Sequence, residues 1–445
     1  MFSRILVANR GEIAVRIIRA CRKLGIETIA VFSEADRDAM HVKLADAAVC
    51  IGPAESARSY LHIPSIISAA EITDVEAIHP GFGFLSENSH FADVCASVGI
   101  KFIGPTSDAM NKMGNKAMAR EIAKKSGVPV LPGSEGVIKD DAEGIKLARE
   151  IGYPVIIKAS AGGGGRGIRV AHNEVSLKSG MQQARQEAEV AFGDGSLYIE
   201  KFLENPRHVE MQILADEHGN VVWLGERDCS IQRRHQKLFE ESPSPVIDDK
   251  VRRKMGECAV SLCKACGYTN VGTIEFLYEK NQFYFMEMNT RIQVEHPVTE
   301  MVTGLDLVEE QLRVASGEKL RWQQADIKPQ GHAVEFRINA EDPDRGFAPF
   351  PGKIDIFVAP TGVNVRCDTF VYSGYRIPAN YDSMIAKLIV KGKDRAEALA
   401  LGETALSQFL LEGIKTTIPF HRKLISNYNF VHNNYDINFI DENFL

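Results

Sequence analysis

The chain has 445 residues, 44% of them hydrophobic and 25% charged, a composition typical of globular proteins. At ~150 residues per domain, this length predicts about three domains. A net charge of −7 makes nucleic acid an unexpected partner. No uninterrupted apolar run is long enough for a bilayer, and we expect no membrane association. The first residues enter a strand without a signal-peptide segment, and the eight cysteines are scattered, so we expect a cytoplasmic protein.

Short apolar strands alternate with helical patterns in residues 1–105. The expected strands are 5–8, 27–32, 47–51, 75–78 and 101–103, and the expected helices are 12–24, 63–71 and 88–98. This alternation predicts a doubly wound parallel sheet. The first turn, Asn9-Arg10-Gly11-Glu12, lacks the GxGxxG fingerprint, so the shape is Rossmann-like without support for dinucleotide binding.

The loop after the fourth strand contains Gly81 and Gly83, which permit close approach of the backbone to a ligand. The alternative, favoured by the sequence alone, is an ordinary strand–helix turn with Ser86 as N-cap. Residues 106–130 have a helical pattern that includes Lys116, and the prolines and glycines of 129–136 indicate a hinge.

A glycine run lies between two strands expected at 154–159 and 168–170. Gly164 and Gly165 belong to this run, and Lys158 precedes it. No Lys-Ser/Thr pair or helix follows, so the segment is not a P-loop. A flexible linker is one interpretation. The flanking strands and the lysine favour a mobile flap whose amides cover phosphate oxygens.

Residues 207–215 alternate, with His208, Glu210 and Gln212 expected on one face of a strand. The basic stretch 227–237 then predicts a hydrogen-bonding loop, either a solvated face or a site for a small anion.

Residues 272–289 predict a β-hairpin. With a three-residue loop at 280–282, Glu275 lies opposite Glu287, and Asn289 shares their face. Like charges so placed repel, which a divalent cation such as Mg²⁺ or Mn²⁺ relieves. If the extended alternation continues, Arg291, Gln293 and Glu295 follow on the same side. The alternative is a solvated polar sheet face. A helix near 305–315, mostly β structure over 331–390 and a helix at 396–410 complete the chain.

Taken together, the flap, the hairpin and its continuation resemble the ATP-grasp superfamily and, over the whole length, the biotin carboxylase family. The motifs that carry the resemblance are ANRGEIA at 8–14, HPGFGFLSEN at 79–88, KASAGGGGRG at 158–167, ENPRHVE at 204–210, ERDCSIQRRHQK at 226–237, EMNTRIQVEHPVTE at 287–300 and RINAEDP at 337–343. The resemblance implies a mixed α/β and α+β fold in three domains. These are a Rossmann-like N-terminal domain over 1–114, an ATP-grasp domain over 115–329 with a mobile glycine-rich lid at about 131–202, and a mostly β C-terminal domain over 330–445.

The resemblance also implies a role for each matching position. ATP-binding positions are Lys116, Lys158, Gly164, Gly165, Glu200, Lys201, Phe202, Leu203, His208, Gln232 and His235, together with the metal ligands Glu275, Glu287 and Asn289. The bicarbonate pocket and catalytic positions are Lys237, Arg291, Gln293, Val294, Glu295 as general base, and Arg337, which stabilises the biotin enolate. The family loop commonly has Tyr where Phe82, a biotin-binding position, stands, and Gly where Ala161 stands.

The activity implied is carboxylation of biotin with ATP, bicarbonate and two Mg²⁺ or Mn²⁺ ions. No Ala-Met-Lys-Met biotinylation site occurs in the chain, so biotin is expected on a separate carrier protein. Expected partners are that carrier, carboxyltransferase subunits and a second copy of the chain, as in acetyl-CoA carboxylase of fatty-acid synthesis. Alternatives are the same component of a pyruvate or other acyl-CoA carboxylase, another ATP-grasp carboxylate–amine ligase and, with least support, a NAD-dependent dehydrogenase.

Overall fold

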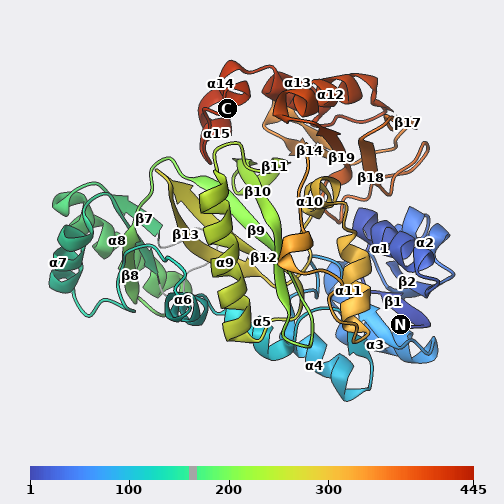
Figure 1. The fold of residues 1–445 in the computed structure, drawn as a ribbon, viewed down its shortest axis with the longest axis horizontal. Helices are drawn as coiled ribbons and strands as arrows, with labels where there is room; N and C mark the ends of the chain where they lie inside the picture. Colours follow the sequence, from blue (N-terminus) through green and yellow to red (C-terminus); the bar gives the residue numbers. More distant parts are fainter. Residues whose placement is uncertain (160–167, 445) are drawn as a thin grey trace. The chain divides into compact units, whose positions relative to one another are not determined.

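The computed structural model describes residues 1–159 and 168–444. The chain forms two compact units, which we describe separately (Figure 1). The larger unit contains Met1–Val128, Arg207–Leu277 and Met286–Leu445, and the smaller unit contains Pro129–Pro206 and Tyr278–Phe285. No helix among the described residues is both long and apolar enough to cross a membrane.

The N-terminal part of the larger unit is a five-stranded parallel sheet with helices between its strands. In sheet order, the strands are β3 (Ala47–Gly52), β2 (Glu27–Ser33), β1 (Arg4–Val7), β4 (Ala77–His79) and β5 (Lys101–Phe102). The connecting helices include α1 (Gly11–Lys23), α3 (Ile63–Ile72) and α4 (Ser89–Ser97). The predicted doubly wound sheet is confirmed, because both the parallel order and the crossover helices are present.

One local prediction for this region is wrong. The N-cap of α4 is Asn88, whose side chain accepts the Phe91 N–H, rather than Ser86. The helical pattern predicted over 106–130 is confirmed for most of its length, as two helices, α5 (Ser107–Gly114) and α6 (Lys116–Lys125). Asn115 separates them because its backbone is extended and its side chain caps α6.

One eight-stranded sheet organises the remainder of the larger unit. Its order is β13 (Gln282–Asn289), β12 (Asn270–Glu279), β9 (Arg207–Ala215), β10 (Val221–Arg233), β11 (Gln236–Ser242), β14 (His332–Asn339), β19 (Met384–Gly392) and β18 (Val365–Thr369). Because β11 pairs with β14, strands from the C-terminal third of the chain extend the sheet that begins with the predicted hairpin.

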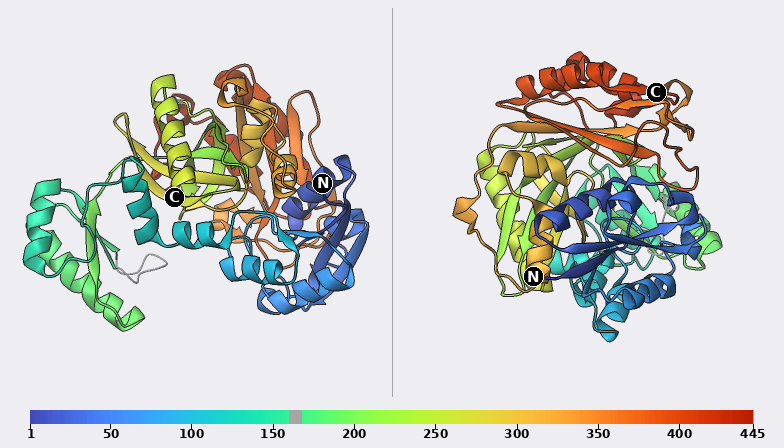
Figure 2. Two further views of the ribbon diagram at one scale, coloured as in Figure 1. Left: turned by 60° about the horizontal axis from the view of Figure 1, so that its bottom comes forward. Right: turned by 90° about the vertical axis from the view of Figure 1, so that its right-hand side faces the viewer.

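Helices cover this sheet. Helix α9 (Asp249–Cys266) lies along the sheet in Figure 1. Gly256 permits its close approach to β10, because a Cβ at this position would lie 2.4 Å from the Trp223 ring. In Figure 2, α12 (Arg395–Gln408) lies on one side of the sheet beside β14 and β19. Cys263 and Cys266 are buried thiols on α9, as predicted.

The predicted basic loop at 227–237 is wrong as a structural assignment. Residues up to Arg233 belong to β10, and β11 begins at Gln236. The turn between them is Arg234–His235, both with positive φ. The stretch therefore presents its basic side chains from paired strands, in a fixed register with Gln232 opposite Lys237.

The smaller unit has its own sheet and core. An antiparallel sheet of β7 (Ile168–Ala171), β6 (Val155–Ala159) and β8 (Leu197–Lys201) packs with α7 (Asp141–Ile151) and α8 (Glu174–Phe192). Helix α8 was not predicted from the sequence. It begins after Asn173, whose side chain forms a capping box with Ser176.

Candidate active site

The hairpin of β12 and β13 has a shorter loop than predicted. The strands end and begin at Glu279 and Gln282, so the turn is Lys280–Asn281 rather than three residues. Both turn residues have positive φ, 52° and 61°, which is typical of a type I′ turn. A regular hairpin of this kind would place Glu275 and Asn289 on opposite faces.

The two side chains nevertheless meet. The amide Nδ2 of Asn289 donates to Oε1 of Glu275 at 2.8 Å. Asn289 is the last residue of β13, and its side chain lies on the Glu275 side of the hairpin.

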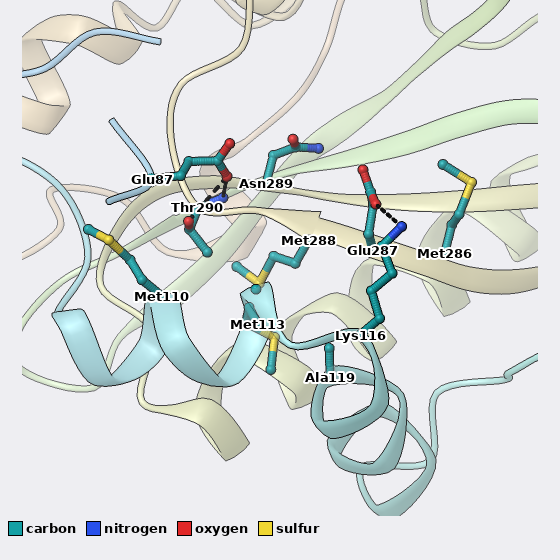
Figure 3. A pocket seen from close by; sticks show the side chains of 11 residues that line it. Glu87, Met110, Met113, Lys116, Ala119, Met286, Glu287, Met288, Asn289 and Thr290 are labelled. Atoms are coloured by element: carbon teal, nitrogen blue, oxygen red, sulfur yellow. Dashed lines mark hydrogen bonds and ion pairs between the residues drawn. The ribbon is translucent and has the colours of Figure 1, made fainter. Parts of the chain in front are cut away.

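Glu287, the third predicted metal ligand, faces a lysine. Its Oε2 lies 3.9 Å from Nζ of Lys116, at the first turn of α6. Figure 3 shows this pair in a pocket whose walls include Met110, Met113 and Glu87. Burial and then the charge of Glu275 raise the pKa of Glu287. A bound cation would relieve that repulsion.

Lys237 lies at the centre of a buried charge network. Its Nζ donates to Oε2 of Glu210 at 2.6 Å, Oε1 of Glu275 at 3.2 Å and Oε1 of Glu295 at 2.6 Å. Burial alone would lower the pKa of Lys237, but Cys229 and then these carboxylates raise it well above the ordinary value. The lysine is therefore cationic at neutral pH.

The predicted base, Glu295, contacts two cations. Oε1 accepts from Lys237, and Oε2 accepts from Nη2 of Arg337 at 2.9 Å. Burial alone would raise the pKa of Glu295, but the charges of Lys237, Arg337 and Arg227 lower it well below the ordinary value. Glu295 is therefore ionised and able to accept a proton.

Arg337 also donates a hydrogen bond to a second carboxylate, that of Glu240. Its Nε donates to Oε1 of Glu240 at 2.6 Å. Burial raises the pKa of Glu240 to about 7 despite the charge of Arg337. The guanidinium therefore lies between a fully ionised carboxylate and one that titrates near neutrality.

Arg227 forms hydrogen bonds with several residues of the network. Its side chain is fully buried, and its nitrogens donate to five side chains. These are Glu210 at 2.6 Å, Gln212 at 2.6 Å, Gln293 at 2.7 Å, Thr299 at 3.0 Å and Thr273 at 3.1 Å. One guanidinium thus orients residues from β9, β12 and the segment after β13.

The expectation that extended alternation continues beyond Asn289 is wrong. Strand β13 ends there, and α10 (His296–Thr303) begins directly after Glu295. Gln293 still reaches Oε1 of Glu275 at 2.9 Å. Nη2 of Arg291 donates to Oδ1 of Asn289 at 2.9 Å. The turn, and not a strand face, gathers these side chains.

The donor set fits a hard divalent cation. Carboxylate and amide oxygens are the ligands that Mg²⁺ and Mn²⁺ prefer. His208, on β9, adds a nitrogen 3.0 Å from Oε2 of Glu275. Within the described residues, His208, Glu210 and Glu275 form one cluster of ligand atoms within 4.8 Å of one another, and Glu287 belongs to no such cluster. Oε1 of Glu275 accepts hydrogen bonds from Lys237, Asn289 and Gln293, which a bound cation would replace.

The remaining ATP-binding positions of the larger unit lie near the turn of β10 and β11. Gln232 is buried opposite Lys237, whereas His235 is exposed in the turn. Phe82 is half-buried. Its carbonyl accepts from Nδ2 of Asn9 at 2.8 Å, and Gly81 beside it has a φ of 64°. A Cβ on Gly81 would lie 2.9 Å from that amide, so glycine is required for this close approach.

The smaller unit holds the other predicted ATP positions. Nζ of Lys158 donates to Oε2 of Glu200 at 2.6 Å, from adjacent strands β6 and β8. Lys201 donates to two backbone carbonyls, and the Phe202 N–H donates to the Pro154 carbonyl at 3.1 Å. Leu203 lies just beyond the end of β8. Gly164, Gly165 and Ala161 lie outside the described residues.

Family models match nearly the whole chain. The biotin carboxylase N-terminal domain matches residues 1–110, the ATP-binding domain of the carbamoyl-phosphate synthase L chain matches 115–323, and the biotin carboxylase C-terminal domain matches 335–442. "Biotin carboxylase 1" of Bacillus subtilis is 57% identical over 99% of this chain and 98% of its own. The chain belongs to the biotin carboxylase family. The resemblance inferred from the sequence motifs is confirmed, and so is the prediction of an ATP-dependent carboxylase.

Relatives from other carboxylases are nearly as similar. A pyruvate carboxylase component of Methanothermobacter thermautotrophicus is 53% identical over 99% of this chain and 90% of its own. The biotin carboxylase domain dimer of Hydrogenobacter thermophilus 2-oxoglutarate carboxylase, solved with MgADP, ADP and bicarbonate, is 48% identical, with a TM-score of 0.91 over 99% of this chain and 98% of that one. Similarity to biotin carboxylases therefore does not select one carboxylase complex.

Sequence reasoning missed several members of the charge network. Glu210 was placed on a polar strand face with His208, but its partners Arg227 and Lys237 were not foreseen. Arg227 was interpreted only as part of a basic stretch. Its sequence neighbours, Glu226 and Asp228, are both charged, so no local apolar pattern marked Arg227 as a buried residue.

Proposed function

We propose that this protein carboxylates biotin on a separate carrier protein, using ATP and bicarbonate, as the first half-reaction of acetyl-CoA carboxylase in fatty-acid synthesis. The observation that supports it best is the ionised Glu295, whose two oxygens contact Lys237 and Arg337 at 2.6 Å and 2.9 Å. A base placed between two cations suits a reaction in which an anion loses a proton and a second oxyanion then develops.

In this proposal, Lys237, Arg291 and Gln293 bind bicarbonate, and Glu295 takes its proton. The resulting dianion attacks the γ-phosphorus of ATP, the bond to the β-phosphate oxygen breaks, and carboxyphosphate and ADP form, while Lys116 and Lys158 bind phosphate oxygens. Glu275, Glu287 and Asn289 would hold Mg²⁺ or Mn²⁺, which neutralises phosphate charge when bound. Carboxyphosphate then gives CO₂ and phosphate. The phosphate deprotonates the ureido nitrogen of biotin, Arg337 stabilises the enolate oxygen, and the nitrogen attacks CO₂ to give carboxybiotin.

The test is ADP release measured with and without bicarbonate and free biotin. We expect ADP release to require bicarbonate and to rise with biotin. ADP release that depends on an amine instead of these two substrates would favour a carboxylate–amine ligase and would refute the proposal.

A second candidate is the same component of a pyruvate or other acyl-CoA carboxylase. The similar identities to a biotin carboxylase and to a pyruvate carboxylase component, 57% and 53%, keep it open. Capture of the biotinylated partner with this chain as bait, followed by its carboxyltransferase assay with acetyl-CoA and pyruvate, separates the two.

We also propose that the protein is cytoplasmic and that it forms a homodimer. The dimer is supported by the related Hydrogenobacter domain, which is described as a dimer. Light scattering at micromolar concentration tests this, and a mass of one chain would contradict it.

A further inference from the structure

Lys387 is a buried, charged residue that has no role in the reaction described above. It lies on β19 directly opposite Arg337 of β14, and its side chain is fully buried. Removing an ammonium from water costs several kcal/mol unless its partners are well placed. A methionine of similar length would fill the same space at no such cost. The lysine must therefore do something that packing does not.

Two groups contact the Lys387 ammonium. Nζ donates to the backbone carbonyl of Val294 at 2.8 Å and lies 3.1 Å from Oε1 of Glu12 on α1. Glu12 is itself 3% exposed, and neither of its oxygens accepts a hydrogen bond from the part of the chain that is described. The carboxylate therefore balances the charge, and the directed hydrogen bond goes to the peptide.

The Val294 carbonyl belongs to the peptide between Val294 and Glu295, and Val294 stands between two site residues. Gln293 precedes it and reaches Glu275 and Arg227, whereas Glu295 follows it and reaches Lys237 and Arg337. Since a peptide is planar and trans, a donor on the carbonyl oxygen also fixes the direction of the Glu295 N–H on the opposite edge. Strand β13 ends at Asn289, so this segment lies outside the ladder of the sheet.

We propose that Lys387 is a positioning residue for bicarbonate. Its ammonium holds the Val294–Glu295 peptide so that Gln293 and Glu295 meet the anion in one geometry. Glu12 on α1 supplies the compensating charge and has no part in positioning the base. The inference rests on the proposed function and deepens it.

The test compares three variants of the full chain. Glu12→Gln keeps the lysine and its bond to Val294. Lys387→Met leaves Glu12 charged in the interior, and Glu12→Gln leaves Lys387 without its carboxylate. The double variant removes both charges of this pair and is therefore the main comparison. Bicarbonate and ATP KM values, kcat and Tm are measured for each.

We expect the double variant to fold with a Tm no lower than that of Glu12→Gln, since it removes both charges of this buried pair, whereas Glu12→Gln leaves the Lys387 ammonium without its carboxylate. The KM of the double variant for bicarbonate should rise about tenfold, because a hydrogen bond from a charged donor is lost, while the KM for ATP is unchanged. Glu12→Gln alone should leave the bicarbonate KM within about twofold. Hydrogen exchange of peptides covering 291–297 should accelerate in the double variant only.

Two results would overturn the proposal: a double variant with the original bicarbonate KM, or a Glu12→Gln variant as impaired as the double. If the double variant does not fold, Lys387→Arg replaces it. Its guanidinium keeps Glu12 paired but does not reproduce the ammonium geometry, so the same KM rise is expected, and an unchanged KM would also overturn the proposal. Absence of bicarbonate-dependent ADP release in the unmodified protein would instead contradict the proposed function itself.

Discussion

Replacing Glu295 by Gln removes the proposed base with almost no change in volume. The Gln side chain keeps one acceptor oxygen, but its NH₂ group replaces the oxygen that accepted from either Lys237 or Arg337. Lys237 retains Glu210 and Glu275, and Arg337 retains Glu240. The cations therefore stay compensated, and we expect a stability loss of about 1.5–3 kcal/mol, the value of one hydrogen bond to a charged group. The fold should persist.

The expected effect on turnover is much larger. A positioned general base contributes about 10²–10⁴-fold, which corresponds to at least about 2.7 kcal/mol of barrier. We expect biotin-dependent ADP release by Glu295→Gln to fall by at least about 10²-fold. The dissociation constant for ATP should not change, because Glu295 contacts none of the proposed nucleotide ligands except through Lys237.

The assay is steady-state ADP release at saturating bicarbonate, with ATP affinity from calorimetry. Glu226→Gln is the matched control. Glu226 is equally buried, both its oxygens contact Arg252 at 2.7 Å and 2.9 Å, and it lies outside the network. We expect the control to lose comparable stability and to keep its turnover. If Glu295→Gln retains turnover within about tenfold of this control, Glu295 is not the base.

Three further predictions address other parts of the larger unit. Arg337→Ala should lower biotin-dependent ADP release by about 10²-fold or more, with ATP affinity unchanged in calorimetry, because an enolate would lose its charge partner. Arg227→Met should destabilise by about 3–5 kcal/mol, measured as a fall in Tm, because it leaves Glu210 buried without this partner. Acid unfolding should depend on Glu241. Burial would raise its pKa, but the charge of Arg395 and the hydrogen bond from His332 lower it to about 2. A lowered pKa means that its stabilisation is present above about pH 4.5 and is lost as the pH falls towards 2, about 3 kcal/mol in all.

Each of these has its own decisive comparison. Full carboxylation activity in Arg337→Ala would remove the role assigned to that residue. An Arg227→Met variant with the Tm of the unmodified chain would show that the five hydrogen bonds contribute little net stability. Glu241→Gln, titrated beside the unmodified protein from pH 5 to pH 2, should show the flatter loss of Tm; parallel curves would refute the assignment.

The parts of the fold that follow from local pattern could be predicted. Alternating strands and helices determine the N-terminal parallel sheet, and period-two alternation identified β9 over the residues that the structure assigns to it. The hairpin was found but its loop was not, because Lys280 and Asn281 form a tight turn without the Asn-Gly or Asp-Gly signal. The predicted register was therefore one residue out, although Asn289, at the end of β13, still donates to Glu275.

Pairing between distant segments could not be predicted from the same patterns. Alternation tells which face of a strand a residue occupies, but not which strand lies beside it. The pairing of β11 with β14 joins segments far apart in the chain, and it brings Glu240 opposite Glu335 and near Arg337. The family motifs identified Arg337 and Glu295. The residues that hold them, Glu240 and Lys387, follow only from the sheet order.

The network also bears on how an ionised base with a lowered pKa could accept a proton. Without substrate, the charges of Lys237 and Arg337 make Glu295 a weak acceptor. Under the proposed function, bicarbonate bound beside these cations would draw part of their charge and so raise the pKa of Glu295. Glu210 and Glu240 would keep both cations in place during this exchange. The base would then become competent only when its substrate is present, which limits loss of the γ-phosphoryl group to water.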